Sequence, residues 1–541
     1  MRKGIIRNKI FKKGFGLLLT AAVASATFMA GCSGGGASSD NGAVLSDEAS
    51  NDAVITYAQI ATWDTLFPWS KSNYYSIGPT DKIFDTLAVS NIDGTVSPRA
   101  AENWEFSEDG LSVTVHLNKN SKWHDGEPVT SADWLWTFET IGNPEVTTAT
   151  SKSYLNILRG YDSSGNIDTS EEPGVEAPDD YTLIFHLDNP SSEVPFFATA
   201  GMYYAVMPKH LLENIAPADL AANEFFTHPI GSGPCTFISE VSGQELTMGS
   251  FSDYYLGAPK FSKLIYRVVA SANLTTSMMA GEIDACYPNI TPDEAKDLEG
   301  VDSITVTKNT DVTALMFVSL NNEKYEPAIR KAVSCAIDKQ MIVDQLLLGE
   351  GSVATSTAIP GGENDVSGIK YEGRDVEKAK ELLKEAGWKD GDTIKCAIPT
   401  GIRERIATIM QQNLEEVGIN LEVITVDAAT MFTGIKDGTY DMAIITANLS
   451  PNPTGLKSLY NSDVVTFGHI TDPYYYNTMV EIEGIQDKAA KEAKLKELYE
   501  KMDEDQPYIL LYHEYIFNIT SPRISGPSIV GYDKVWTWEV K

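Results

Sequence analysis

Histidine and cysteine, the residues that most often bind metals or attack substrates, are few and scattered in this chain of 541 residues. No two histidines have the spacing of metal ligands on one element; they lie at positions 116, 124, 186, 210, 228, 469 and 513. The cysteines beyond residue 50 lack Cys-x-x-Cys spacing; they are Cys235, Cys286, Cys335 and Cys396. The sequence therefore predicts no protein-built metal site and no cofactor.

Two further patterns match chemical motifs by spacing alone. Gly31-Cys32-Ser33-Gly34-Gly35 fits the Gly-x-Ser-x-Gly nucleophile elbow, but no strand, turn and helix surround it. The polar run at 162–168 is faintly similar to a calcium loop, but its glycine is misplaced and no acid closes it, which indicates a polar turn. Acidic residues are abundant, yet no motif identifies two carboxylates at the distance from each other that a glycosidase needs. A secreted hydrolase is thus the less favoured alternative, and no catalytic residue is assigned.

The charge balance narrows the range of partners. The chain has 42 Lys and Arg residues against 75 Asp and Glu residues, a net charge of −33. Such a surface repels phosphate backbones and anionic lipids, so nucleic acid is disfavoured as a partner. Hydrophobic residues make up 43% of the chain, and its length allows more than one core. We therefore expect a soluble protein with several globular parts.

The first 52 residues differ from the rest. Basic residues precede an apolar run at 15–29 that is too short to span a bilayer, as in a signal peptide. The run ends in Met29-Ala30-Gly31-Cys32, and a Gly/Ser-rich stretch follows. This resembles a bacterial lipobox, which implies that Cys32 receives diacylglycerol and becomes the new N-terminus. An ordinary secretory signal with an incidental cysteine is the alternative.

The lipobox resemblance implies a signal peptide at 1–31 and a flexible tether at 32–52. The folded part would then lie at the extracellular face of the cell membrane, or in the periplasm. Only the lipid anchor would hold it to the membrane.

Beyond residue 52, predicted strands alternate with predicted helices. Period-two apolar patterns at 111–117 and 181–187 predict half-buried strands. Thr291-Pro292-Asp293-Glu294 has the hydroxyl, the proline and the acid of a capped helix start. Helical spacing at 375–386 and at 403–417 precedes a strand at 420–426. This alternation predicts an α/β fold.

Five separated motifs occur in one order along the chain. They are Trp123-His124-Asp125-Gly126 with the turns before it, Pro229-Ile230-Gly231-Ser232-Gly233-Pro234, Gly281-Glu282-Ile283-Asp284, Ile329-Arg330-Lys331-Ala332 with Ala336-Ile337-Asp338-Lys339, and Leu382-Leu383-Lys384-Glu385-Ala386-Gly387. This set resembles the signature of the oligopeptide, dipeptide and nickel-binding family of solute-binding proteins that serve ABC importers, bacterial extracellular solute-binding protein family 5. Most of these residues are scaffold: the Asp-Gly pairs suit turns, and we expect Trp104, Trp123 and Trp134 to fill core space.

The resemblance implies a periplasmic-binding-protein-like fold of type II, with two α/β lobes and an additional domain inserted near the N-terminus. Lobe I is expected at 53–83, 222–311 and 515–541, and lobe II at 312–514. The inserted domain is expected at 84–221. The ligand is then expected in the cleft between the lobes, which closes around it.

The function implied is transport without catalysis. The protein would capture a peptide or peptide-like solute and deliver it to the permease subunits of an ABC importer, acting as a monomer. One alternative keeps the fold but makes the protein a ligand sensor or pheromone receptor. Another, further from the pattern, is a binder of a metal chelate or an oligosaccharide.

The family's ligand contacts map to two segments of this chain. The first gives Tyr74, Tyr75, Ser76 and Ile77, and the second gives Ala447, Asn448, Ser450 and Asn452. Peptide binders of the family usually have Gly-Trp followed by an Asp whose carboxylate pairs with the peptide ammonium. Here Ala447 stands about where the Trp should be, and Ser450 or Asn452 about where the Asp should be. Since an unpaired buried ammonium is costly, the usual hold on a free peptide N-terminus is not expected from this segment.

Two arginines complete the predicted site. The dipeptide branch of the family holds the substrate carboxylate with an arginine at a strand-to-helix junction. Arg403 and Arg405 follow Pro399-Thr400-Gly401 near that place, and a guanidinium fork suits a carboxylate. The alternative for each is a solvated arginine in the first turn of a helix.

Overall fold

The computed structural model describes residues 53–541 except 71–73, 92–94, 151, 169, 171, 288–289, 363, 450–451, 463 and 528–533. Residues 51–541 form one compact unit. The predicted signal peptide, Cys32, the tether and Ser450 lie outside the described residues, as do the side chains at 74 and 311–313.

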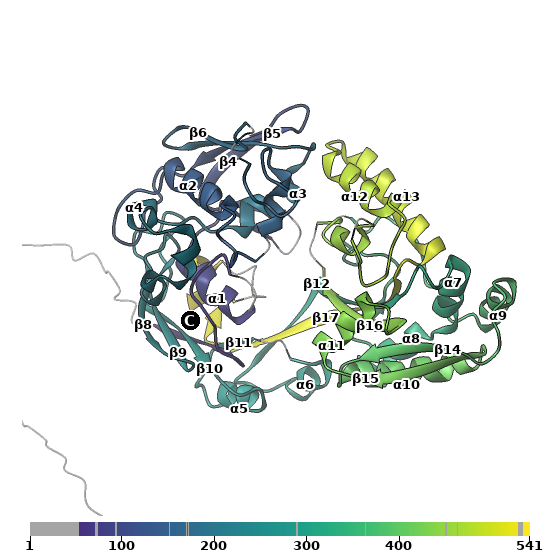
Figure 1. Ribbon diagram of the computed structural model, residues 1–541. Helices are drawn as coiled ribbons and strands as arrows, with labels where there is room; N and C mark the ends of the chain where they lie inside the picture. The colour runs from purple at the N-terminus through teal and green to yellow at the C-terminus, as the bar shows by residue number, and fades with distance from the viewer. Residues whose placement is uncertain are drawn as a thin grey trace, which may run out of the picture. The chain divides into compact units, whose positions relative to one another are not determined.

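The main sheet of the described part has eleven strands (Figure 1). Ten follow one another in the order β15-β14-β16-β12-β17-β11-β1-β10-β9-β8, and β13 pairs with β17. Their bounds are β1 Val54–Gln59, β8 Cys235–Val241, β9 Glu245–Ser250, β10 Lys263–Val268, β11 Ala285–Tyr287, β12 Thr305–Leu320, β13 Gly351–Val353, β14 Asp392–Ile398, β15 Ile419–Thr425, β16 Met442–Asn448 and β17 Ile509–Thr520. We call β14, β15 and β16 the β16 group, and β1, β10 and β11 the β1 group. The strands within each group are parallel.

Two long strands, β12 and β17, connect the groups. β16 pairs with the second half of β12, from Ala314 to Leu320, whereas β11 pairs with the end of β17 at Thr520. β12 and β17 are antiparallel along most of their length, with register shifts between Asn309 and Thr313 and between Met316 and Phe317. The sheet therefore passes from one group to the other without an edge.

Helices cover both faces of the β16 group, as is usual for parallel strands. Met316 and Val318 of β12 pack with α7, α8, α9 and α10, whereas Leu315 and Phe317 pack with α11, α12 and α13. The helices are α7 Pro327–Ala336, α8 Lys339–Leu346, α9 Val376–Glu385, α10 Ile402–Glu415, α11 Ala428–Lys436, α12 Tyr474–Gly484 and α13 Lys488–Asp505. The predicted helices at 375–386 and 403–417 and the strand at 420–426 are confirmed within two residues.

A second sheet lies within residues 101–186. It has the strand order β4-β5-β7-β6, with bounds β4 Ala101–Phe106, β5 Ser112–Leu117, β6 Val175–Asp179 and β7 Thr182–His186. Val113 and Val115 face Phe185 and Leu183 across the β5–β7 pair, which confirms both half-buried strands. Trp123 and Trp134 are fully buried in the adjoining core, as predicted, whereas Trp104 is half-buried and donates a hydrogen bond from Nε1 to Glu193.

The other α-helices and β-strands lie outside the two sheets described above. They are α1 Tyr74–Ile83, α2 Ser131–Gly142, α3 Glu193–Phe196, α4 Lys209–Leu212, α5 Leu274–Met279, α6 Pro292–Asp297, β2 Ala88–Ser90, β3 Val96–Pro98, β18 Ile524–Ser525 and β19 Glu539–Val540. The predicted cap of α6 is confirmed, because Thr291 accepts from the Glu294 N–H and Glu294 accepts from the Thr291 N–H. At the predicted polar turn, Asp162 Oδ1 accepts from the backbone N–H groups of Ser164 and Asn166.

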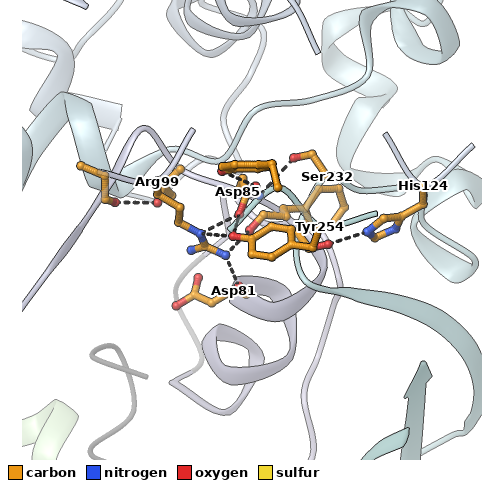
Figure 2. Close-up of polar contacts among 11 residues, drawn as sticks. Asp81, Asp85, Arg99, His124, Ser232 and Tyr254 are labelled. Atoms are coloured by element: carbon orange, nitrogen blue, oxygen red, sulfur yellow. Dashed lines mark hydrogen bonds and ion pairs between the residues drawn. The ribbon is translucent and has the colours of Figure 1, made fainter. Parts of the chain in front are cut away.

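A buried ion pair joins the chain after α1 to more distant segments (Figure 2). Arg99 Nε lies 2.6 Å from Asp85 Oδ1, and both side chains are almost fully excluded from solvent. The hydroxyls of Tyr254 and Tyr255 donate to the two Asp85 oxygens at 3.1 and 2.9 Å. Arg99 Nη2 donates to the Asp81 carbonyl at 2.8 Å. Every oxygen of the buried carboxylate thus has a donor, as such a charge requires.

Two hydrogen bonds connect the chain before α3 with the end of α12. Ser192 Oγ donates to the Glu483 carbonyl at 3.0 Å, and Gln486 Nε2 donates to the Ser191 carbonyl at 2.7 Å. Apart from the main sheet, these bonds are therefore a direct link between the region of the second sheet and the helices beside the β16 group.

Candidate functional site

The carboxyl ends of the two strand groups point toward the same stretch of β17. β16 ends at Asn448, which pairs through Ala314 with Glu514. β11 pairs with Thr520 at Ala285 and runs antiparallel to β17, so its carboxyl end points back toward Glu514. In open α/β sheets, ligands bind outside the carboxyl ends of the parallel strands. The site is therefore expected between these ends, where most of the residues predicted from the sequence also lie.

The predicted segment on the β1 side begins α1. Tyr75 is half-buried, and its ring packs edge-on against Tyr287 with the ring centroids 5.8 Å apart. Gln59, the last residue of β1, donates a hydrogen bond from Nε2 to the Tyr75 carbonyl at 3.3 Å. Burial raises the pKa of Tyr75, so its hydroxyl remains protonated at neutral pH. Tyr75 thus lies at the carboxyl ends of β1 and β11.

The neighbours of Tyr75 differ in what they can offer a ligand. Ile77 is half-buried, so part of its side chain is accessible. Ser76 is buried, and its hydroxyl donates to the carboxylate of Asp64. This side chain is therefore already engaged in the protein's own contacts. For Tyr74 the structure describes the backbone alone, at the first position of α1.

Arg403 lies in the first turn of α10, after the carboxyl end of β14. Gly401 precedes the helix with a φ of 108°, a conformation that favours glycine. Arg403 Nε donates to the Ile444 carbonyl at 3.0 Å, and Nη2 donates to Thr446 Oγ1 at 2.7 Å. These bonds hold the guanidinium over the end of β16. No other hydrogen bond of this group is formed with the described residues, so it keeps N–H donors for a ligand.

Two rows of paired residues surround the Arg403 guanidinium. Asn448, Ala314 and Glu514 pair across β16, β12 and β17, and Thr446, Met316 and Tyr512 form the row two residues away. Paired residues, and residues two apart on a strand, share one face of a sheet. We call Arg403, Thr446, Asn448, Tyr512 and Glu514 the Arg403 cluster. It brings one cation, one carboxylate and three neutral polar groups to the same face.

The two charged groups of the cluster, Arg403 and Glu514, are partly buried. Burial lowers the pKa of the Arg403 guanidinium, and the negative charge of Glu514 opposes that shift. Burial raises the pKa of the Glu514 carboxyl, and Arg403 opposes that shift. Charges attract each other more strongly where water is excluded, so a charged ligand group would gain more here than at the surface.

Of the other predicted residues, Asn448 belongs to this cluster, whereas Ala447, Asn452 and Arg405 lie apart from it. Asn448 is exposed at the end of β16, and Ala447 packs on the opposite face with the core around α11 to α13. Asn452 Oδ1 accepts hydrogen bonds from the N–H and the hydroxyl of Thr454, so it stabilises a local turn. Arg405 is exposed and has no polar partner among the residues that the structure describes. Of the two predicted arginines, Arg403 is therefore the better placed to contact a ligand.

Sequence reasoning missed Tyr512 and Glu514. They lie more than 60 residues from the rest of the cluster and join it through strand pairing. One signal was present: Glu514 is the one acid in the largely apolar and aromatic run at 509–520, at the predicted boundary between the lobes.

A cavity of about 300 Å³ lies elsewhere, between α7, α9 and α13. Lys339 is buried in its wall and donates to Ser334 Oγ at 3.0 Å, and burial lowers the pKa of its ammonium to about 8. No member of the Arg403 cluster lines this cavity, and it opens between helices rather than at strand ends. We therefore take the strand ends as the candidate site.

The described residues show no group of three His, Cys, Asp or Glu side chains that could hold a metal ion. The cysteines in the same part of the chain are unpaired, and burial raises the pKa of Cys235, Cys286 and Cys396 to about 12. Their thiols are thus poor nucleophiles. None of the helices that the structure describes is both long enough and apolar enough to cross a membrane.

Comparison with known proteins agrees with the arrangement of the strands. Residues 95–466 match the family described as bacterial extracellular solute-binding proteins, family 5 Middle. The oligopeptide-binding protein AppA of Bacillus subtilis is 27% identical over 533 residues, 92% of this chain and 93% of AppA. The glutathione-binding protein GsiB of Pectobacterium atrosepticum is 25% identical over 88% of this chain and 91% of its own. The structure of B. subtilis AppA in complex with a nonapeptide superposes with a TM-score of 0.72 and 23% identity, covering 91% of this chain and 99% of AppA.

Proposed function

The chain belongs to the bacterial extracellular solute-binding proteins of family 5, and we propose that it binds a peptide or peptide-like solute and delivers it, chemically unchanged, to an ABC importer. The oligopeptide-binding and glutathione-binding relatives support a peptide-like solute. The observation that carries the proposal is the Arg403 cluster at the facing carboxyl ends of two strand groups. Its charged groups keep unused donors and acceptors, as a binding site requires.

The proposed architecture has two lobes that close around the solute. Lobe I comprises 53–83, 222–311 and 515–541, and lobe II comprises 312–514, with an inserted domain at 84–221. The crossing strands β12 and β17 support this division, because β12 pairs with the β16 group, β17 pairs with the β1 group, and the two strands pair with each other. Tyr75 and Ile77 would contact the solute from lobe I, and Arg403 and Asn448 from lobe II. The protein would act as a monomer with the permease subunits as its partners.

Added peptides should stabilise the purified protein. A synthetic pool of peptides of three to nine residues is expected to raise the free energy of unfolding by about 2.7 kcal/mol at a hundredfold excess over Kd. Small-angle scattering should show a more compact protein with the pool than without it. If peptide pools produced neither stabilisation nor compaction, the proposed function would be wrong.

Arg403→Gln is expected to weaken peptide binding about tenfold or more, because it removes a charged donor to the solute carboxylate. Arg405→Gln is the matched control: the same residue type, in the same turn, but exposed and without a polar partner in the described chain. Calorimetric titration of both variants gives the comparison. Equal effects of the two substitutions would contradict the role proposed for Arg403.

We also propose that the mature protein is anchored through a lipid on Cys32, at the extracellular face of the cell membrane. A bacterial host fed with a labelled fatty acid should incorporate the label into the wild-type protein and not into Cys32→Ala. The variant should also leave the membrane fraction after cell lysis. Cys286→Ala is the control and should keep the label. Labelling of Cys32→Ala, or its retention in the membrane, would contradict the proposed anchor.

A further inference from the structure

Glu514 is a half-buried carboxylate without a polar partner among the residues that the structure describes. It lies on β17 between Ala314 of β12 and Gly351 of β13. Among the described residues it forms no ion pair and accepts no hydrogen bond. Burying a carboxylate without a partner is costly, and proteins retain such a group chiefly where a ligand or a second charge completes it.

Arg403 is the obvious candidate for that second charge, but its geometry commits it elsewhere. Two of its N–H donors bond the Ile444 carbonyl and Thr446 Oγ1, which lie on β16. β12 separates β16 from β17, and no Arg403 nitrogen comes within 4.0 Å of a Glu514 oxygen. The two charges therefore influence each other electrostatically but do not neutralise each other by contact.

Tyr512 provides a second, independent sign of an incomplete site. Its side chain is fully buried on the same face as Glu514, two residues earlier on β17. Within the described part of the chain, its hydroxyl has no hydrogen-bond partner. Leaving a buried hydroxyl without a partner is costly, so a polar group that reached this hydroxyl would be favoured.

The segment at the end of β16 lacks a carboxylate that a ligand could use. Residues 446–452 contain no acid, so they provide no carboxylate for a cationic nitrogen of the solute. Glu514 lies level with Asn448 of that segment, two strands away across the small side chain of Ala314. It places a carboxylate on the face where Arg403 offers its unused donors.

We propose that Glu514 binds the cationic nitrogen of the solute, which in a peptide is the amino-terminal ammonium. This inference depends on the proposed function, because it names the group that the same site recognises. It makes a free amino terminus a requirement for tight binding, with the carboxylate supplied by the crossing strand β17 rather than by the end of β16. Arg403 then remains available for a solute carboxylate.

The experiment compares two forms of one synthetic pentapeptide pool, with free and with acetylated amino termini, by calorimetric titration. Wild-type protein should bind the free pool at least tenfold more tightly than the acetylated pool. Glu514→Gln keeps the size of the side chain and removes its charge, so the free pool should lose at least tenfold in affinity while the acetylated pool changes less than twofold. Glu422→Gln, an exposed acid on β15 of the same sheet, is the matched control and should change neither.

The outcomes separate this inference from the transport function. If wild-type protein binds both pools equally, Glu514 does not recognise the ammonium, whereas peptide binding stands. If Glu514→Gln weakens both pools by the same factor, Glu514 serves the fold or a contact with Arg403, and the inference is again overturned. If wild-type protein binds neither pool, the proposed function and the inference fail together. The wild-type comparison alone decides ammonium recognition if the variant does not fold.

Discussion

Replacing Asp85 by alanine should destabilise the protein by about 3–5 kcal/mol, the scale for breaking a buried ion pair by removing one partner. The guanidinium of Arg99 would remain in a place with almost no solvent, without the carboxylate 2.6 Å away that neutralises it. The hydroxyls of Tyr254 and Tyr255 would lose their acceptor at the same time. Urea unfolding followed by tryptophan fluorescence measures the effect.

A surface pair is the control for Asp85. Asp253 lies 2.9 Å from Lys122, and both side chains are about half-exposed, so Asp253→Ala should cost less than about 1 kcal/mol. The double variant Asp85→Leu with Arg99→Met should recover most of the lost stability, because it removes both charges and keeps apolar volume. If Asp85→Ala and Asp253→Ala lowered the free energy of unfolding by similar amounts, burial would not increase the contribution of the Asp85–Arg99 pair to stability.

Gly231→Ala should destabilise the protein by about 3 kcal/mol or more, beyond the usual cost of overpacking. A Cβ at this position would lie 1.8 Å from the carbonyl oxygen of Ile83 and 2.7 Å from its carbonyl carbon. Both atoms belong to the backbone, so a side-chain rotation cannot relieve the clash. The same oxygen accepts the Gly233 N–H at 2.8 Å, so a shift would also strain that bond.

Gly387→Ala is the control that distinguishes the steric clash at Gly231 from the cost of a positive φ alone. Gly387 has a φ of 70°, and nothing lies within 4 Å of a Cβ built there. Its substitution should cost about 1–2 kcal/mol through conformation alone. Thermal unfolding of the two variants gives the comparison, and an equal or larger loss at Gly387 would show that the Ile83 backbone can move aside.

The local parts of the fold were predictable from the sequence because their causes are local. The alternation at 111–117 produced β5, and the hydroxyl, proline and acid at 291–294 produced the cap of α6. The motif acids also had structural roles, as expected. Asp338 caps α8 by accepting the Met341 N–H, and buried Asp284 accepts the Thr56 N–H and pairs with Arg523.

The candidate site was predictable only in part. Arg403 could be proposed because it follows a strand and begins a helix, a junction that the sequence shows. Glu514 could not, because β12 alone brings β17 beside β16, and no spacing along the chain expresses that pairing. Two other predicted ligand contacts are already engaged by local hydrogen bonds, which the sequence does not reveal. Ser76 and Asn452 had suitable side chains, but Asp64 and Thr454 already engage them.

The two hydrogen bonds between Ser191 and Ser192 and the end of α12 have a consequence for how a solute enters. If the lobes separate as proposed, both bonds break, and water can replace each at a net cost of about 1 kcal/mol. These two bonds are too weak to keep the unliganded protein in the closed form. They add, however, to the stability that a bound solute gives to that form. The bound solute, rather than these two bonds, would then decide whether a transporter encounters the open or the closed form of the protein. Unliganded molecules would therefore compete poorly for the docking surface of the transporter.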